Sequence, residues 1–233
     1  MYLSKIDQLY DFDFLLNPEI LMGFASGIGT TLSVAFFGVL IGIFLGVFLA
    51  IGKLLGNKPV KALCTIYINF VRGTPLLIQL YMIYYIPDFI LNAYGLGTLG
   101  LNGYVVGIVA VGLNSAAYVA EIFRGGILSV DKGQFEAASS LGFDYKKTLR
   151  LIILPQALKN ILPTLGNEFI VVIKETAIIS VIATKDLMFY ANQIRSTTGN
   201  PFAALIFAAL IYFIIIYVLS KLVKMWEEKL QND

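Results

Sequence analysis

The longest polar stretch of the chain, residues 131–155, reads DKGQFEAASSLGFDYKKTLRLIILP. Its first part predicts a short helix with one apolar face, because three apolar residues recur at helical spacing: Phe135, Ala138 and Leu141. Gly142 follows directly and is a natural C-terminal stop for such a helix. Asp144 can then cap a second, basic helix. The basic residues of that helix are Lys146, Lys147 and Arg150.

On both sides of this stretch the sequence is strongly apolar. The chain has 233 residues, of which 58% are hydrophobic and only 14% are charged, whereas about 25% of a soluble domain is charged. A bilayer crossing needs about 20 apolar residues. Five segments are long enough: Leu21–Leu55, Val60–Ile86, Gly103–Phe123, Pro155–Ile182 and Pro201–Met225. The sequence therefore predicts an all-α polytopic membrane protein with five transmembrane helices.

The distribution of lysine and arginine predicts the orientation of these spans. With the N-terminus outside, twelve of the 17 basic residues lie in inside loops and in the C-terminal tail. Only Lys5, Lys185 and Arg195 lie outside, while Arg72 and Lys174 lie within spans. Since basic residues concentrate on the cytoplasmic side, we expect an N-out, C-in topology. Residues 1–19 then form an extracytoplasmic or interfacial segment, 20–226 the transmembrane domain and 227–233 a cytoplasmic tail.

The first span carries a repeat of small residues, Gly38-x3-Gly42-x3-Gly46. Glycines four residues apart share one face of a helix and let a second helix approach closely. We interpret this repeat as a packing surface and not as part of a transport path.

The polar stretch resembles the EAA loop of ABC importer permeases. Its fixed positions are Glu136-Ala137-Ala138, then Gly142, then Ile152-x-Leu154-Pro155 after nine further residues. Other runs resemble the polar amino-acid uptake branch of that family: Val71–Leu76 (VRGTPL), Ser115–Ile127 (SAAYVAEIFRGGI), Gly133-Gln134, Leu154–Ala157 (LPQA) and Leu165–Glu168 (LGNE). A mild departure is Ala177 after Lys174-Glu175-Thr176, where the branch often has a Ser or Thr pair.

This resemblance implies a type I, MetI-like permease fold in a bacterial cytoplasmic membrane. It implies a second permease subunit, for which we favour a homodimer, together with two copies of an ATP-binding subunit and an extracytoplasmic solute-binding protein. Within segment 131–155, the residues that would contact the ATP-binding subunit are Glu136, Ala137, Ala138, Leu141 and Gly142. The implied function is ATP-driven import of polar amino acids by alternating access.

If ATP drives transport, the sequence predicts that another chain binds it. No Gly-x-x-x-x-Gly-Lys-Ser/Thr motif occurs, so we expect ATP and Mg²⁺ to be bound by the partner and this chain to have no catalytic residue. A secondary transporter is the alternative, but no inverted internal repeat is evident. An intramembrane enzyme is a third class, for which no motif is present. The chain has no histidine, and its net charge of +2 gives no reason to expect nucleic acid. We expect no metal site.

The second and third spans hold candidate residues for the substrate path. Gly73 and Pro75 predict a kink beside Arg72 and Thr74, and broken helices near the bilayer midplane are where transporters commonly bind polar ligands. A kink serving only packing remains the alternative. The third span has a polar stripe consisting of Asn114, Tyr118 and Glu121. Glu121 lies near the inner end beside Arg124, so we interpret it as a structural or gating ion pair.

The fourth span carries the leading candidate for contact with a cationic substrate group. Glu168 lies near mid-depth with Asn167 beside it. Charge inside a bilayer is costly, so a buried acid usually faces protein or a water-filled cavity. Internal salt bridges could explain the charged residues of the spans, but acids outnumber bases there. This excess favours basic amino acids, although every amino acid carries an α-ammonium group.

Overall fold

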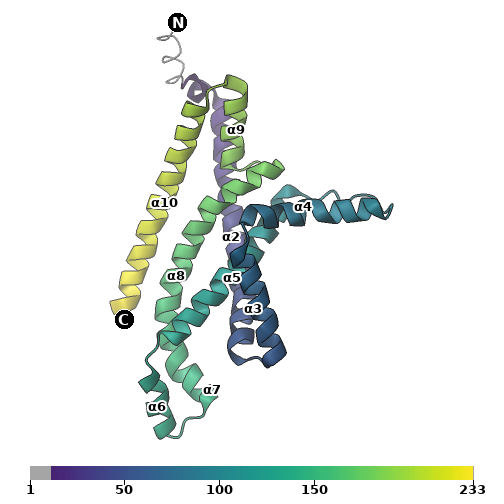
Figure 1. Ribbon diagram of the computed structural model, residues 1–233. Coiled ribbons are helices and arrows are strands. Elements are labelled where there is room, and N and C mark those ends of the chain that lie inside the picture. The colour runs from purple at the N-terminus through teal and green to yellow at the C-terminus, as the bar shows by residue number, and fades with distance from the viewer. Residues whose placement is uncertain (1–11, 233) are drawn as a thin grey trace.

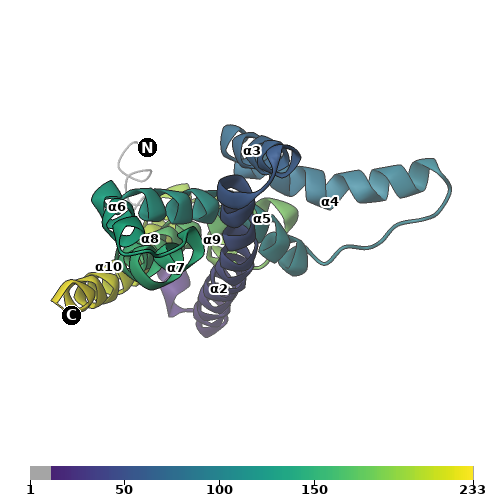
Figure 2. The ribbon, with the colours of Figure 1, turned by 90° about the horizontal axis from the view of Figure 1, so that it is seen from below.

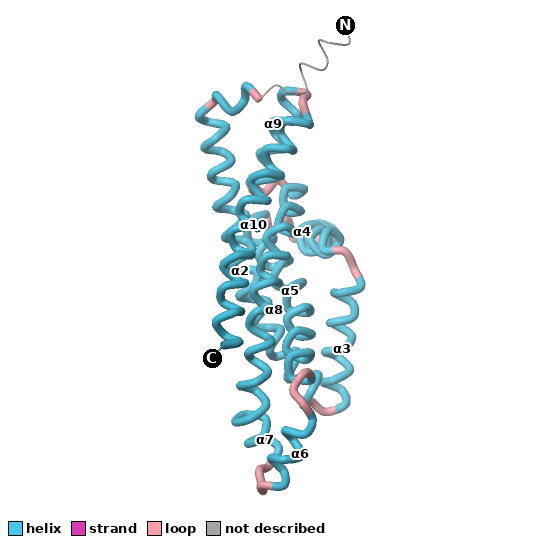
Figure 3. The backbone as a smooth tube through the Cα atoms, turned by 90° about the vertical axis from the view of Figure 1, so that its left-hand side faces the viewer, coloured by secondary structure: helices cyan, strands magenta, loops and turns pink. Residues whose placement is uncertain are grey.

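The computed structural model describes residues 12–232, and within that range it is helical and contains no strand. Residues 1–11 of the expected N-terminal segment lie outside the described part. The elements are η1 (Asp13–Leu16), α2 (Pro18–Leu55), α3 (Lys58–Gly73), α4 (Leu76–Ala93), α5 (Gly103–Leu128), α6 (Lys132–Ser140), α7 (Tyr145–Thr148), η2 (Leu149–Ile153), α8 (Leu154–Glu175), η3 (Thr176–Ile182), α9 (Leu187–Thr198) and α10 (Pro201–Asn232). The long helices α2, α8 and α10 run roughly side by side (Figures 1 and 3).

Helices α2 and α5 form the closest pair of the bundle. The three glycines of α2 lie directly against one face of α5: Gly38 against Val111, Gly42 against Ser115 and Gly46 against Val119. The same register repeats every four residues on both helices. The packing interpretation of the glycine repeat is therefore confirmed. Between α2, α5 and α8 lies an apolar core that includes Val34, Ala110 and Val172.

Four helices of the described chain are long and apolar enough to cross a membrane: α2, α4, α5 and α10. The expected spans 21–55, 103–123 and 201–225 are confirmed as α2, α5 and α10, each longer than predicted. The fourth expected span is helical as α8 and η3. It falls outside the set of four because polar residues such as Lys159 and Glu168 lower its hydropathy.

The second expected span, Val60–Ile86, is wrong as a single helix. The chain leaves helical geometry at Thr74, whose φ and ψ are −122° and 143°, and resumes at Leu76 as α4. The residue before a proline avoids the helical region, so Pro75 produces a full break where we expected a kink. Helix α4 then runs across the direction of α2 and projects away from the bundle (Figures 1 and 2).

The two ends of the bundle carry different short elements. Helix α9, which we did not predict, lies beside the N-terminal half of α2 and packs with α10 through an apolar cluster that includes Phe24, Leu187 and Ala204. The helices α6 and α7 project from the opposite end (Figure 1). This separation places the segment 131–155 at the end of the molecule far from α9.

Candidate functional site

The helix break between α3 and α4 is held by one glutamine side chain. Gln79 Nε2 donates to the backbone oxygens of Val71 (2.9 Å) and Thr74 (3.1 Å) and to Thr74 Oγ1 (2.9 Å). Its Oε1 accepts from Asn114 Nδ2 on α5 at 3.1 Å. Thr74 and Asn114, both predicted to contact substrate, are thus joined to each other through Gln79. We did not single out Gln79, although it is the lone amide in the apolar run 76–86.

A cavity of about 380 Å³ lies between α3, α5 and α8. It is lined by Arg72, Tyr118, Glu121, Ile122, Thr164, Asn167, Glu168 and Val171. Four of the six predicted substrate-contact residues therefore come together from three helices that are distant in sequence. The other two, Thr74 and Asn114, do not line this cavity.

Glu168 is positioned at this cavity by a hydrogen bond from α5. Ser115 Oγ donates to Glu168 Oε1 at 3.1 Å, and the Glu168 side chain is only half-buried. Ser115 is itself buried and lies against Gly42 of α2. The absence of a side chain at Gly42 therefore leaves room for Ser115 to approach α2 while it holds the carboxylate.

Glu121 is the centre of an ion-pair cluster at the other side of the cavity. Its carboxylate pairs with Lys53 Nζ at 2.7 Å and with Arg124 at 2.8 Å and 3.0 Å. Arg72 Nη1 is more distant, at 3.7 Å from Glu121 Oε2, and its guanidinium lies 5.5 Å from the centre of the Tyr118 ring. The expected ion pair of Glu121 is confirmed. The contribution of Lys53 was missed, because we assigned it to the inside basic residues at the end of the first expected span.

The charges of the cavity are therefore divided between its two sides. Arg72 is 44% exposed and makes the longest of the three contacts to Glu121, which already has two closer cations. Glu168 provides a carboxylate whose described partner is the neutral Ser115. A cationic group on one side and an anionic group on the other match a zwitterion, whose ammonium and carboxylate need opposite partners.

The segment 131–155 has the predicted hairpin of two short helices. Asp131 caps α6 through the backbone N–H of Gly133, and Asp144 caps α7 through that of Lys147, each at 2.7 Å. Gly142 has φ +81°, and the N–H of Phe143 reaches back to the oxygen of Ala138 at 3.0 Å. This is the Schellman end expected of a C-terminal glycine. A π-helical turn, η2, then joins α7 to α8 without a break.

The hairpin exposes part of its predicted coupling set and buries the rest. Ala138 is buried and Phe135 stacks on Tyr145, with ring centres 5.8 Å apart. Leu141, the third residue of the expected apolar face, is 77% exposed. Leu141 is the C-cap residue of α6. It forms, with Glu136 and Ala137, the outward surface of the hairpin.

Comparisons with known proteins agree with this geometry. Residues 38–232 match the family model described as "Binding-protein-dependent transport system inner membrane component". A Rickettsia prowazekii protein named "Putative glutamine transport system permease protein GlnP" is 39% identical over 91% of this chain and 94% of its own length. The arginine transport system permease protein ArtQ of Bacillus subtilis is 38% identical over 89% of this chain and 92% of its own.

A solved structure extends the comparison to three dimensions. The chain superposes on the crystal structure of an amino acid ABC transporter with histidines with a TM-score of 0.85 and 43% identity, covering 94% of this chain and 98% of that chain. The architecture is thus that of a type I, MetI-like importer permease. The chain belongs to the family of inner membrane components of binding-protein-dependent transport systems.

Proposed function

We propose that this member of the family is the permease subunit of an ATP-driven ABC importer that carries polar L-amino acids, basic ones among them, across the bacterial cytoplasmic membrane. The observation that carries the proposal is the cavity that brings Arg72 and Glu168 together from α3 and α8. Relatives named for glutamine and arginine transport support the substrate class.

In the proposed binding mode, Glu168 receives the α-ammonium group of the substrate and Arg72 receives the α-carboxylate. Both groups are common to every amino acid, so these two contacts recognise the class and not the individual side chain. Asn167 and Tyr118 complete the lining. Thr74 and Asn114 act indirectly, because their hydrogen bonds to Gln79 hold the helix break that positions Arg72.

The proposed assembly contains two permease chains, two ATP-binding subunits and a solute-binding protein on the outside. The outward surface of the hairpin, Glu136, Ala137 and Leu141, is the contact with the ATP-binding subunit. Helix α4 projects from the bundle and, of its 18 residues, buries only Gln79 and Leu80, which is consistent with a second permease chain beside it. ATP-driven closure of the partner subunits moves the hairpin, and access to the cavity alternates.

Transport by purified complexes in liposomes tests the substrate contact. We expect Glu168→Gln to reduce uptake of the preferred amino acid at least tenfold while the complex still assembles, because the ammonium group loses its counter-charge. Glu228→Gln is the matched control, since it removes the charge of an exposed acid on α10 that does not line the cavity. Unchanged uptake kinetics in Glu168→Gln would overturn the proposed contact. Uptake driven by an ion gradient in liposomes without ATP would overturn the importer class.

Charge reversal on the hairpin tests the ATPase contact. We expect Glu136→Lys to abolish substrate stimulation of ATP hydrolysis without affecting membrane insertion. Glu228→Lys reverses the charge of an exposed acid on α10 instead, away from the hairpin, and should leave stimulation intact. Full stimulation in Glu136→Lys would refute the docking assignment. Gly142→Pro, which breaks the turn itself, should act in the same direction as Glu136→Lys.

A further inference from the structure

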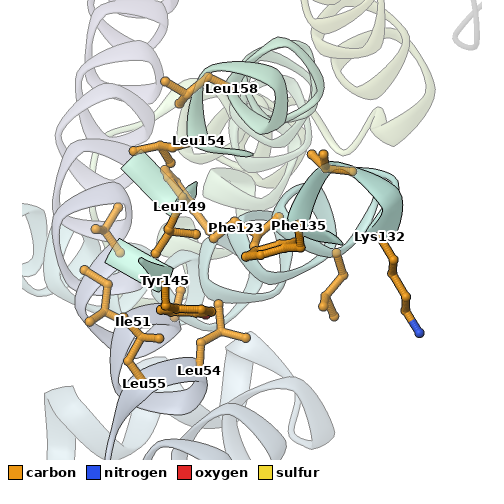
Figure 4. A pocket seen from close by; sticks show the side chains of 15 residues that line it. Ile51, Leu54, Leu55, Phe123, Lys132, Phe135, Tyr145, Leu149, Leu154 and Leu158 are labelled. Atoms are coloured by element: carbon orange, nitrogen blue, oxygen red, sulfur yellow. The ribbon is translucent and has the colours of Figure 1, made fainter. Parts of the chain in front are cut away.

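A second and larger cavity, of about 560 Å³, lies between the hairpin and the ends of the long helices (Figure 4). It shares no residue with the cavity that contains Glu168. Its lining is Val47, Ala50, Ile51, Leu54, Leu55, Phe123, Ile127, Leu128, Val130, Lys132, Phe135, Tyr145, Leu149, Leu154 and Leu158. Apart from Lys132 and the hydroxyl of Tyr145, every one of these side chains is apolar.

With the expected N-out, C-in topology, this cavity lies at the inner boundary of the bilayer. One wall is the last turns of α2, which ends at Leu55, and another is the end of α5 at Leu128. The third wall belongs to the hairpin and to the start of α8, and includes the stacked rings of Phe135 and Tyr145. The cavity therefore lies where acyl chains of the inner leaflet meet the polar loops.

The size and lining of the cavity indicate an apolar occupant. Water gains little in such a space, because it needs two to four polar partners and the lining offers almost none. A volume of 560 Å³ lies in the range of ligand sites that are mostly apolar with a few polar groups.

The one charged residue that lines the cavity is a cation, Lys132. The ammonium group of Lys132 points away from the apolar side chains (Figure 4). Exposed basic residues flank the lining on the α7 and η2 side: Lys146, Lys147 and Arg150. Of the nearby acids, Asp131 and Asp144 cap helices through their carboxylates, and Glu136 is exposed on the same helix as Lys132 but does not line the cavity. A lipid with an anionic headgroup fits this site, because its headgroup could lie beside Lys132 while an acyl chain enters the apolar cavity. Basic pockets on the cytoplasmic side of membrane helices commonly bind anionic lipids.

We propose that this cavity binds one acyl chain of an anionic phospholipid from the inner leaflet, with the lipid phosphate beside Lys132. The bound chain fills the space between the hairpin and helices α2 and α5, so it joins the hairpin to the bundle. The bound lipid then adjusts how strongly movement of the hairpin is transmitted to the spans. This regulatory role rests on the proposed function. Binding itself does not depend on that function.

Quenching of tryptophan fluorescence by brominated lipids tests the site. The chain has a single tryptophan, Trp226, so Trp226→Phe with Tyr145→Trp leaves one probe in the cavity of the full-length permease. In phosphatidylcholine vesicles with a minor fraction of phosphatidylglycerol, either lipid is brominated in turn. We expect phosphatidylglycerol to quench the probe about fivefold more than its mole fraction predicts, because this is the preference that the attraction of one lysine gives to an anionic lipid.

Two further variants make the result specific. In Lys132→Gln, quenching by phosphatidylglycerol relative to that expected from its mole fraction should fall to a ratio close to one. Quenching by either lipid should persist, because the acyl chain still enters the cavity. Phe44→Trp in the Trp226→Phe background places the probe on α2 at a residue that is 63% exposed and outside this cavity, and should show no preference. Equal quenching by both lipids at Tyr145→Trp, or no quenching, would overturn the proposal. So would a cross-link that places a segment of the ATP-binding subunit in the cavity.

The regulatory consequence has its own measurement in the assembled transporter. Substrate-stimulated ATP hydrolysis should rise with the phosphatidylglycerol content of the liposomes, and Lys132→Gln should flatten that rise. A rise unchanged in Lys132→Gln would refute the regulatory role. Failure of the substrate assignment would instead appear as unchanged uptake in Glu168→Gln, so the two outcomes are distinguishable.

Discussion

The register between α2 and α5 allows a sharp test of how this bundle is packed. A Cβ atom added at Gly38 would lie 2.6 Å from Val111 Cγ1 and 3.1 Å from Val111 Cβ, whereas carbon atoms pack best at about 3.5–4.0 Å. We therefore expect Gly38→Ala to destabilise the protein through overpacking, by about 1–3 kcal/mol. Val111→Ala alone leaves a cavity where two buried methyl groups packed, and should cost about 1–2 kcal/mol.

The two changes together should cost less than their sum. In the double variant the new methyl group of residue 38 enters the space that Val111 Cγ1 occupied, and the nearest remaining side-chain atom is the Cβ at 3.1 Å. A separation of that size needs a shift of only a few tenths of an ångström. We expect a coupling free energy of about 1–2 kcal/mol in favour of the double variant, within the usual range for residues in contact.

Equilibrium unfolding in mixed detergent micelles would measure these free energies. Gly29→Ala is the matched control, because Gly29 is also inside α2 but has no neighbour within 4 Å of an added Cβ atom. Its combination with Val111→Ala should be additive. If Gly38→Ala and Val111→Ala were also additive within about 0.5 kcal/mol, the register between the two helices would be refuted.

Three further substitutions probe the site and the hairpin. Glu121→Gln leaves Lys53 and Arg124 without their carboxylate, so the melting temperature of the purified protein should fall, and adding Lys53→Gln should recover part of the loss. Gly142→Ala places a side chain at φ +81°, at a cost of about 1–2 kcal/mol, and should weaken substrate stimulation of ATP hydrolysis more than Gly142→Asn does. Gln79→Leu removes the hydrogen bonds across the helix break, so uptake into liposomes should fall while assembly persists.

Much of this architecture could be predicted from local features of the sequence. Long apolar runs gave three spans directly, because crossing a bilayer requires length and hydropathy that few other structures share. The hairpin could be predicted from two short-range signals, Asp144 as an N-cap and Gly142 as the C-terminal stop of a helix. Glu168 and Arg72 could be singled out as candidate site residues because charges inside a membrane are expensive and therefore few.

Other features depended on tertiary contacts that no local pattern contains. Pro75 indicated an interruption, but the direction of α4 after the break depends on Gln79 and on its partner Asn114 on α5. Lys53 lies at the end of a span, where a basic residue usually faces solvent, yet it reaches Glu121 across the α2–α5 interface at 2.7 Å. Helix α9 was missed because its sequence has no clear apolar periodicity. It is stabilised by apolar contacts with α2 and α10, which are distant in sequence.

Both helices that reach the hairpin also position the carboxylate of Glu168, the proposed contact for the ammonium group of the substrate. Helix α8 continues from the hairpin through η2 and carries Glu168 fourteen residues after Leu154, about 21 Å along the helix axis. Helix α5 enters the hairpin from the other side and carries Ser115, which donates to that same carboxylate. A displacement of the hairpin that moved the two helices unequally would therefore stretch the Ser115–Glu168 hydrogen bond. In this arrangement movement at the proposed ATPase contact would change the environment of Glu168, the proposed substrate acid, without a separate relay between the two sites.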